Sequence, residues 1–247
     1  MSTELFVVCL GLALALALAA GFRLLPRERW QVIASVPTHK DPEGRWVGRN
    51  LTFYGLISAV AEVFGAAMAL LLASAAGVPR EETIAVMGVL IVVGLAASRT
   101  VARWIEGKRN TFTVGGAVFV GILLTPVVVA LVNHVGVWAG AGPVPARALL
   151  AALAIGYVYG EGLGRLACVS FGCCYGKPLD RLGPGWRRLF ERLSFTFHGE
   201  TKKIAYAHGW AGIKVVPIQA MTATALTLCA LTSTLLFLHA HHAAAFV

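Results

Sequence analysis

Long apolar stretches alternate with short polar segments along almost the whole chain. Each stretch has about twenty residues, the length that an α-helix needs to cross the roughly 30 Å hydrocarbon core of a bilayer. The pattern predicts about six membrane-spanning helices, near Leu5–Leu25, Leu51–Ala76, Ile84–Val101, Val114–Val137, Ala148–Phe171 and Val215–Leu238. We therefore expect an all-α fold, a polytopic integral membrane helical bundle, with residues 1–247 forming a single membrane domain.

The composition supports a membrane protein. Hydrophobic residues make up 57% of the 247 residues and charged residues 13%, and the mean hydropathy is +0.74, outside the range of ordinary soluble domains. The first apolar stretch, within residues 1–25, is too long for a signal peptide and has no basic segment before it. We expect it to be retained as an additional N-terminal helix.

The net charge of +9 is distributed unevenly among the connecting segments. Lys and Arg residues gather after the first, third and fifth predicted helices, whereas the alternate connections contain only Arg80 and Arg147. By the positive-inside rule, the basic connections are expected in the cytoplasm and both termini outside. Because the basic residues are dispersed along membrane-flanking loops without a nucleic-acid-binding module, we do not expect nucleic acid as a partner.

The most basic of these connections, residues 176–214, also contains aromatic residues interleaved with its charges. Such a mixture suits the head-group level of a membrane, where aromatic rings lie toward the lipid and cations toward water. The aromatic residues include Trp186, Phe190, Phe195, Phe197, Tyr206 and Trp210. The pattern fits a small interfacial subdomain that covers a site, and it fits an ordinary anchoring loop equally well.

Two ionisable residues stand out inside the fifth predicted helix. Glu161 and Arg165 have the i, i+4 spacing that places them on one helix face, and ionisable residues at membrane depth are costly and usually functional. Arg165 lies about two helical turns from the following polar loop, within reach of a phosphate at the membrane boundary. Glu161 is the candidate for orienting Arg165 or for taking a proton, because a buried carboxyl holds a proton more readily. The alternative is a mutually neutralised pair that only packs the bundle.

Three cysteines follow in the same region, Cys168, Cys173 and Cys174. Their C-x4-C-C spacing differs from the usual C-x2-C pattern of zinc and redox sites, and no nearby His completes a ligand set. We therefore expect no metal and no cofactor. A thiolate near Lys177 could be reactive, although no His adjacent in sequence would activate it.

Residues 164–178 resemble the signature of the bacterial prolipoprotein diacylglyceryl transferases, which reads approximately G-R-x-G-N-F-x-N-G-E-x-x-G-R-P. The alignment has no gaps, and Lys177 keeps the charge of the family's Arg. The identical positions are Gly164, Arg165, Gly172, Gly176 and Pro178. Weaker landmarks occur in the family's order over roughly residues 51–238. Phe53–Leu56 resembles its W-Y-G-L, Gly94–Arg99 its first G-R stretch, Phe112–Gly116 its F-H-G-G and Pro217–Gln219 its P-S-Q.

The resemblance implies a phospholipid-dependent transferase of the bacterial inner membrane that acts in lipoprotein biogenesis. A family member moves a diacylglyceryl group from an anionic phospholipid, phosphatidylglycerol, to the thiol of a lipoprotein cysteine, and an Arg holds the glycerol phosphate that leaves. Arg165 corresponds to that Arg and is the main catalytic candidate beside Glu161. The positions expected to bind substrate are Tyr54, Arg99, Gly164, Cys168, Cys173, Gly176, Lys177 and Gln219.

The chain departs from the family at positions associated with its chemistry. Val114, Cys168 and Cys173 stand where the family has His, Asn and Glu, so no general base is implied. The charge pattern also places the signature on the cytoplasmic side, whereas the family presents it outside. We therefore hypothesise a divergent transferase with a different acceptor. The alternatives are a noncatalytic lipid-binding membrane protein derived from that family and a membrane thiol-redox protein.

Overall fold

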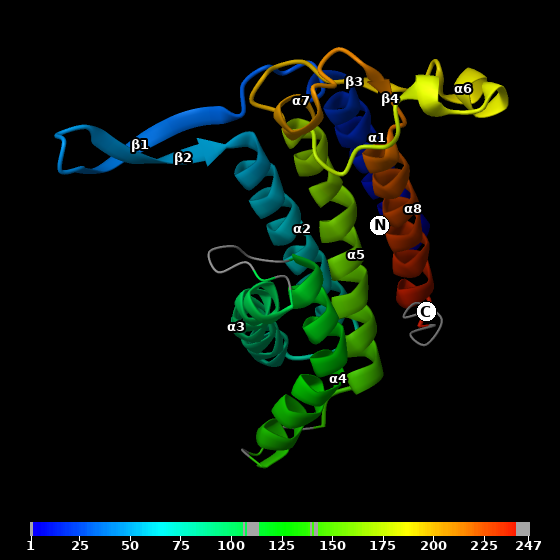
Figure 1. Cartoon of the computed structure of the whole chain (residues 1–247). Helices are drawn as coiled ribbons and strands as arrows, with labels where there is room; N and C mark the ends of the chain where they lie inside the picture. The colour runs from blue at the N-terminus through cyan, green and yellow to red at the C-terminus, as the bar shows by residue number, and fades with distance from the viewer. Residues whose placement is uncertain (1, 106, 108–113, 139, 141–142, 241–247) are drawn as a thin grey trace. The chain divides into compact units, whose positions relative to one another are not determined.

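Six long helices dominate the computed structural model of the chain (Figure 1). They are α1 (Thr3–Leu24), α2 (Phe53–Ala75), α3 (Arg80–Trp104), α4 (Val114–Trp138), α5 (Ala146–Phe171) and α8 (Ile218–Leu238). The structure describes residues 2–105, 107, 114–138, 140 and 143–240. Each predicted span corresponds to one of these helices, and the prediction of an all-α polytopic membrane bundle is confirmed.

Five of these helices, α1, α2, α3, α4 and α8, are long and apolar enough to cross a membrane. Only 11% to 33% of the residues in their most apolar windows are buried within the protein, so most of their side chains form the kind of apolar surface that lipid covers. Helix α5 lies outside this set, in keeping with the charges of Arg147, Glu161 and Arg165. The chain is thus a multi-pass membrane protein.

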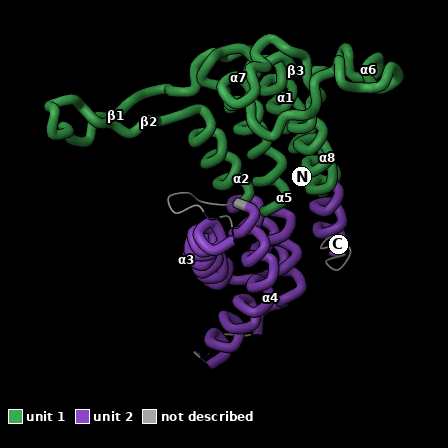
Figure 2. Tube along the Cα trace, in the orientation of Figure 1, with its two compact units in different colours: residues 1–65, 157–231 green, residues 66–156, 232–247 purple. Residues whose placement is uncertain are grey.

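Contacts between residues divide the chain into two compact units (Figure 2). The first comprises residues 1–65 and 157–231, and the second comprises residues 66–156 and 232–247. Helices α3 and α4 pack against each other within the second unit. The region with the transferase-like signature belongs to the first unit, and the expected single membrane domain stays a prediction.

Between α1 and α2 the chain forms an antiparallel hairpin that the hydrophobic pattern did not predict. Strand β1 (Val32–Lys40) pairs with β2 (Trp46–Thr52), and every residue of β1 is exposed. Strand β2 continues directly into α2. The second long helix therefore begins at Phe53, two residues after the start expected near Leu51, because the strand pairing takes the two residues before it.

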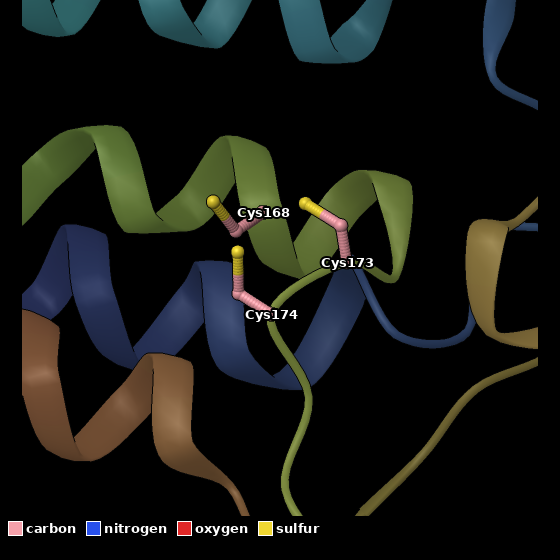
Figure 3. Close-up of side chains that lie close together, drawn as sticks. All are labelled: Cys168, Cys173 and Cys174. Carbon is pink, nitrogen blue, oxygen red and sulfur yellow. The ribbon is translucent and has the colours of Figure 1, made fainter. Parts of the chain in front are cut away.

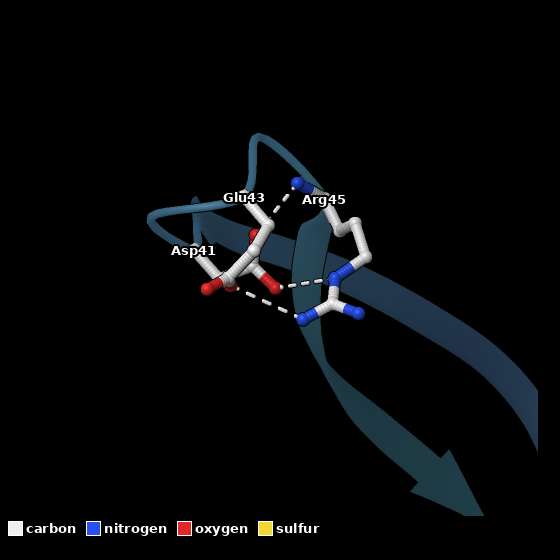
Figure 4. Close-up of polar contacts among 3 residues, drawn as sticks. All are labelled: Asp41, Glu43 and Arg45. Atoms are coloured by element: carbon white, nitrogen blue, oxygen red, sulfur yellow. Dashed lines mark hydrogen bonds and ion pairs between the residues drawn. The ribbon is translucent and has the colours of Figure 1, made fainter.

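The turn of this hairpin is held by the side chain of Arg45 and its acidic neighbours (Figure 4). Its Nε donates to Oδ2 of Asp41 at 2.8 Å, and its backbone N–H donates to Oδ1 at 2.7 Å. Glu43 accepts a further bond at 3.1 Å. Because exposed ion pairs contribute only about 0 to 1 kcal/mol, the hairpin depends mainly on its own strand pairing.

The segment after α5, residues 172–217, folds into short elements that were also not predicted. They are the 3-10 helix η1 (Leu179–Arg181), α6 (Pro184–Phe190), β3 (Phe195–Thr196), α7 (Lys203–His208) and β4 (Lys214–Val215). Phe195, Phe197, Ile204 and Val215 form a buried cluster with Val169 of α5. The basic and aromatic segment predicted at 176–214 is thus folded onto the end of α5.

A buried lysine joins this segment to the ends of two helices. Lys202 is fully buried, and its Nζ donates to the carbonyl oxygens of Leu25 at 2.9 Å and Ser170 at 2.5 Å, at the C-terminal ends of α1 and α5. The last carbonyls of a helix lack intrahelical donors, and the helix dipole favours a cation there. Gln31 donates a second bond to the oxygen of Ser170 at 2.6 Å.

Candidate functional site

The region with the transferase-like signature leaves α5 through a Schellman turn. Gly172 has a φ of +66°, its N–H donates to the oxygen of Val169 at 3.3 Å, and the N–H of Cys173 donates to the oxygen of Cys168 at 3.1 Å. These two bonds satisfy carbonyls at the helix end. Such a turn brings together two side chains, that of the residue directly after the glycine and that of the residue four positions before the glycine. Here those residues are Cys173 and Cys168, so the turn accounts for their C-x4-C spacing.

Cys174 completes a cluster of three thiols. It has a φ of +54°, a left-handed conformation that residues other than glycine rarely adopt. The sulfur atoms of Cys168, Cys173 and Cys174 all lie within 4.8 Å of one another, and Figure 3 shows the three side chains gathered where α5 ends. Cys173 is buried, Cys168 half-buried and Cys174 exposed. We call these three residues the thiol cluster.

The surroundings favour ionisation of one member of the thiol cluster. Hydrogen bonds from Cys168 and Cys173 lower the pKa of Cys174, and the positive charges of Arg165 and Lys203 lower it further. Hydrogen bonding within the cluster and burial raise the pKa of Cys173. Cys174, the exposed member, is therefore the thiol of the cluster that ionises most readily. The thiolate is the form of cysteine that acts as a nucleophile and as a metal ligand.

Arg165 and Glu161 form an ion pair along α5, as their spacing predicts. Their side chains are 27% and 25% exposed, so the pair is not sealed inside the protein. Within the described residues, Nε of Arg165 is buried and has no hydrogen-bond partner. Tyr157 lies within electrostatic range of Glu161. A partly exposed guanidinium can bind an oxyanion.

Tyr54 approaches the same place from the start of α2. Its ring packs edge to face on Phe171, with 5.6 Å between the ring centroids. It lies within electrostatic range of Arg165 and of all three thiols. The structure thus brings together residues from α2, α5 and the turn that follows α5. Tyr54, Arg165, Cys168 and Cys173 among them were candidates from the sequence.

Two further candidates, Gln219 and Gly176, shape the turn. Gln219 is 1% exposed, and its Nε2 donates to the backbone oxygen of Cys173 at 2.7 Å. Its Oε1 is buried without a partner among the described residues. The N–H of Gly176 donates to the oxygen of Val216 at 3.2 Å, and a Cβ at Gly176 would lie 2.7 Å from that oxygen. These contacts give both residues a role in positioning the cysteines.

The other candidates have more open surroundings. Among the described residues, nothing beyond the neighbouring stretch of α5 lies within 4 Å of where a Cβ on Gly164 would be, and Lys177 is exposed. Arg99 belongs to the second unit, in α3, where it helps to line a hollow of about 330 Å³. Its expected place beside Arg165 stays a prediction. Phe112 and the side chain of Val114, which belong to the weaker landmarks, lie outside the described part of the chain.

Cys174 and Tyr157 also contribute to this site, although neither was assigned a catalytic or substrate-binding role from the sequence. Tyr157 lies one helical turn before Glu161, so its i, i+4 spacing was a signal for the contact. Cys174 was noted with the other cysteines, but its left-handed backbone has no signature in the sequence. The site is therefore a cation, a carboxylate, two tyrosines and three thiols within one unit of the fold.

Comparisons of the chain with models of protein families, with curated proteins and with solved structures find no match. The resemblance to the diacylglyceryl transferases therefore rests on residues 164–178 and on the weaker landmarks around them. Function has to be argued from the geometry and chemistry of the site.

Proposed function

We propose that this chain is a phospholipid-dependent transferase of the bacterial inner membrane. It would move a diacylglyceryl or related lipid group from an anionic phospholipid, such as phosphatidylglycerol, to an acceptor. The observation that supports this most is the side chain of Arg165, which is partly exposed and lies within the segment that resembles the transferase signature. Guanidinium groups bind phosphate oxygens through charge-assisted hydrogen bonds.

In the proposed reaction, a nucleophile of the acceptor forms a bond to the glyceryl carbon that carries the phosphate. The carbon–oxygen bond to the phosphate breaks, its electron pair leaves with the phosphate oxygen, and the proton of the acceptor passes to water. Arg165 stabilises the charge that gathers on the leaving phosphate. Glu161 holds the guanidinium in position, since a carboxylate paired with Arg is a weak base. Tyr54 offers a hydroxyl to the head group.

The charge pattern of the loops extends this proposal to topology. Eight Lys and Arg residues follow α5 between Lys177 and Lys214. If α5 is counted as a sixth crossing, this excess predicts that the site faces the cytoplasm and both termini lie outside. An acceptor on the cytoplasmic side differs from a secreted lipoprotein. Labelling of the exposed Cys174 in sealed vesicles of known orientation tests this, and labelling only from the outer side would reverse the assignment.

The transferase proposal is tested by the release of glycerol phosphate from phosphatidylglycerol vesicles that contain the purified protein and an acceptor thiol. We expect Arg165→Met to lower release at least about 100-fold, because the leaving charge loses its counter-ion. The matched control is Arg147→Met, since Arg147 is exposed near the other end of the same helix. If wild-type protein binds the lipid but neither releases glycerol phosphate nor transfers lipid to any acceptor supplied, the noncatalytic lipid-binding alternative replaces the enzyme.

The proximity of the three thiols favours a second candidate function, that of a membrane thiol-redox protein. Sulfur atoms within 4.8 Å can exchange a disulfide after small side-chain rotations. This alternative requires that a Cys173→Ser, Cys174→Ser double variant loses all function. Retention of lipid transfer by that variant would exclude it.

A further inference from the structure

The thiol cluster has the geometry of a metal site. We propose that Cys168, Cys173 and Cys174 together bind one thiophilic d10 metal ion, Zn²⁺ or Cu⁺. Their sulfur atoms lie within 4.8 Å of one another, and three sulfurs bound to one Zn²⁺ at about 2.3 Å lie about 3.8 Å apart. Side-chain rotations that move each sulfur inward by about 0.6 Å or less complete the site. This inference does not rest on the proposed transferase activity.

The C-x4-C-C spacing, which differs from the usual pattern of metal sites, is compatible with metal binding because of the Schellman turn. A C-x2-C pair approaches a metal through a tight turn, and here the turn at Gly172 gives Cys168 and Cys173 the same proximity across four intervening residues. Cys174 and Ala240 are the non-glycine residues with positive φ among those that the structure describes. Backbone held in such a conformation is typical of functional sites, and at Cys174 it coincides with a thiol that faces two others.

The groups around the thiol cluster suit a thiolate-bound cation. Metal-bound cysteines are deprotonated, so three thiolates around Zn²⁺ carry a net charge of −1, and the positive charges of Arg165 and Lys203 act on Cys174. Gln219 holds the backbone of Cys173 from outside the cluster, in the manner of a residue that orients a metal ligand.

The site has an open side, because Cys174 is exposed while Cys173 is buried. Three protein ligands with one open position are the arrangement of zinc sites that exchange or activate a fourth ligand. Three thiolates alone suit Cu⁺, which prefers soft sulfur ligands. Both ions therefore share the same ligand chemistry, and binding measurements distinguish them.

The experiment uses the full-length protein in detergent, reduced and stripped of metal with a chelator. Titration with Co²⁺, a spectroscopic substitute for Zn²⁺, should give sulfur-to-cobalt charge-transfer absorption that saturates at one ion per chain and disappears when Zn²⁺ is added. A parallel titration measures Cu⁺ in competition with a chromogenic Cu⁺ chelator. Each of Cys168→Ser, Cys173→Ser and Cys174→Ser should weaken binding at least 100-fold.

The chain supplies matched controls in Cys9 and Cys229, which are exposed cysteines on α1 and α8. Cys9→Ser and Cys229→Ser should bind metal as wild type does. The proposal is overturned if reduced wild-type protein binds neither Co²⁺ nor Cu⁺, a result that needs no variant to fold. It is also overturned if binding survives loss of the cluster cysteines. Metal binding without glycerol phosphate release would support the metal site and exclude the transferase. Glycerol phosphate release without metal binding would support the transferase and exclude the metal site.

Discussion

Two cations near the end of α5 have opposite surroundings. Nζ of Lys202 is fully buried and donates to two carbonyl oxygens at the ends of α1 and α5. Arg165 is partly exposed, is paired with Glu161 and keeps a buried Nε without a partner among the described residues. Lys202 thus uses its charge to join parts of the protein, whereas Arg165 retains capacity for a ligand.

This difference separates residues that support the fold from residues that support the proposed chemistry. A buried cation that donates to carbonyl oxygens inside the protein contributes to stability and is inaccessible to a substrate. A partly exposed cation with an unused donor costs stability and persists where it serves function. Loss of Lys202 should therefore change stability, and loss of Arg165 should change activity.

The largest expected effect is that of Lys202→Ala on stability. The change removes two charge-assisted bonds and a buried side-chain stem, so the free energy of unfolding should fall by about 3 kcal/mol. Thermal unfolding in detergent measures the loss. Lys203→Ala, at the exposed neighbouring position, is the control and should unfold near the wild-type temperature. Equal stability of the two variants would show that Lys202 does not hold the helix ends together.

The next effect is that of Arg165→Met, which should lower glycerol phosphate release at least about 100-fold, equivalent to about 2.7 kcal/mol of transition-state stabilisation. Its unfolding temperature should stay close to that of wild type, because the ion pair with Glu161 is partly exposed and contributes little. Arg165→Lys should recover part of the release, since it keeps the charge without the planar fork. A variant that unfolds as readily as Lys202→Ala would instead make Arg165 a structural residue.

The pattern of the sequence was sufficient for the helices but not for the contacts that distinguish these two cations. Apolar length predicted all six long helices because a bilayer imposes it, and i, i+4 spacing predicted the pair of Glu161 and Arg165. Lys202 is one of eight basic residues after α5, and its burial depends on the folding of residues 172–217, which carries no simple periodicity. The exposed hairpin of β1 and β2 was missed for a similar reason.

The thiol cluster could be predicted from the sequence in part. The positions of Cys168, Gly172 and Cys173 match those of a Schellman turn, so their proximity could have been predicted once α5 was placed to end at Phe171. The positive φ of Cys174 could not, because glycine and asparagine are the residues that normally indicate it. The proximity of all three thiols, on which the metal hypothesis depends, could therefore not be predicted from the sequence alone.

A smaller effect is expected where the turn contacts the next element. Gly176→Ala should destabilise the protein by about 1 to 3 kcal/mol, because the new Cβ would lie 2.7 Å from the backbone oxygen of Val216. Gly183→Ala is the matched control, since among the described residues nothing beyond its chain neighbours lies within 4 Å of its Cβ position. Unfolding temperature is the measurement. If Gly176→Ala retains stability but loses lipid transfer, Gly176 contacts substrate as the family resemblance implies.

The smallest effect concerns pH and returns to Lys202. Burial lowers the pKa of Lys202 from 10.5 to about 8, because the charged form loses its hydration. The unfolded chain therefore binds more protons than the folded one between pH 8 and 10.5, and stability should increase as the pH rises through this window. The gain from pH 7 to pH 9 is about 1 kcal/mol.

This pH effect is isolated by comparing wild type with Lys202→Met, which keeps an unbranched stem and lacks the titrating amine. All other titrating groups are common to both proteins, so the difference between their stabilities should change by about 1 kcal/mol from pH 7 to pH 9. Parallel curves would mean that Lys202 keeps an ordinary pKa. Water would then reach its ammonium group, and Lys202 would no longer differ from Arg165 in being shielded from solvent.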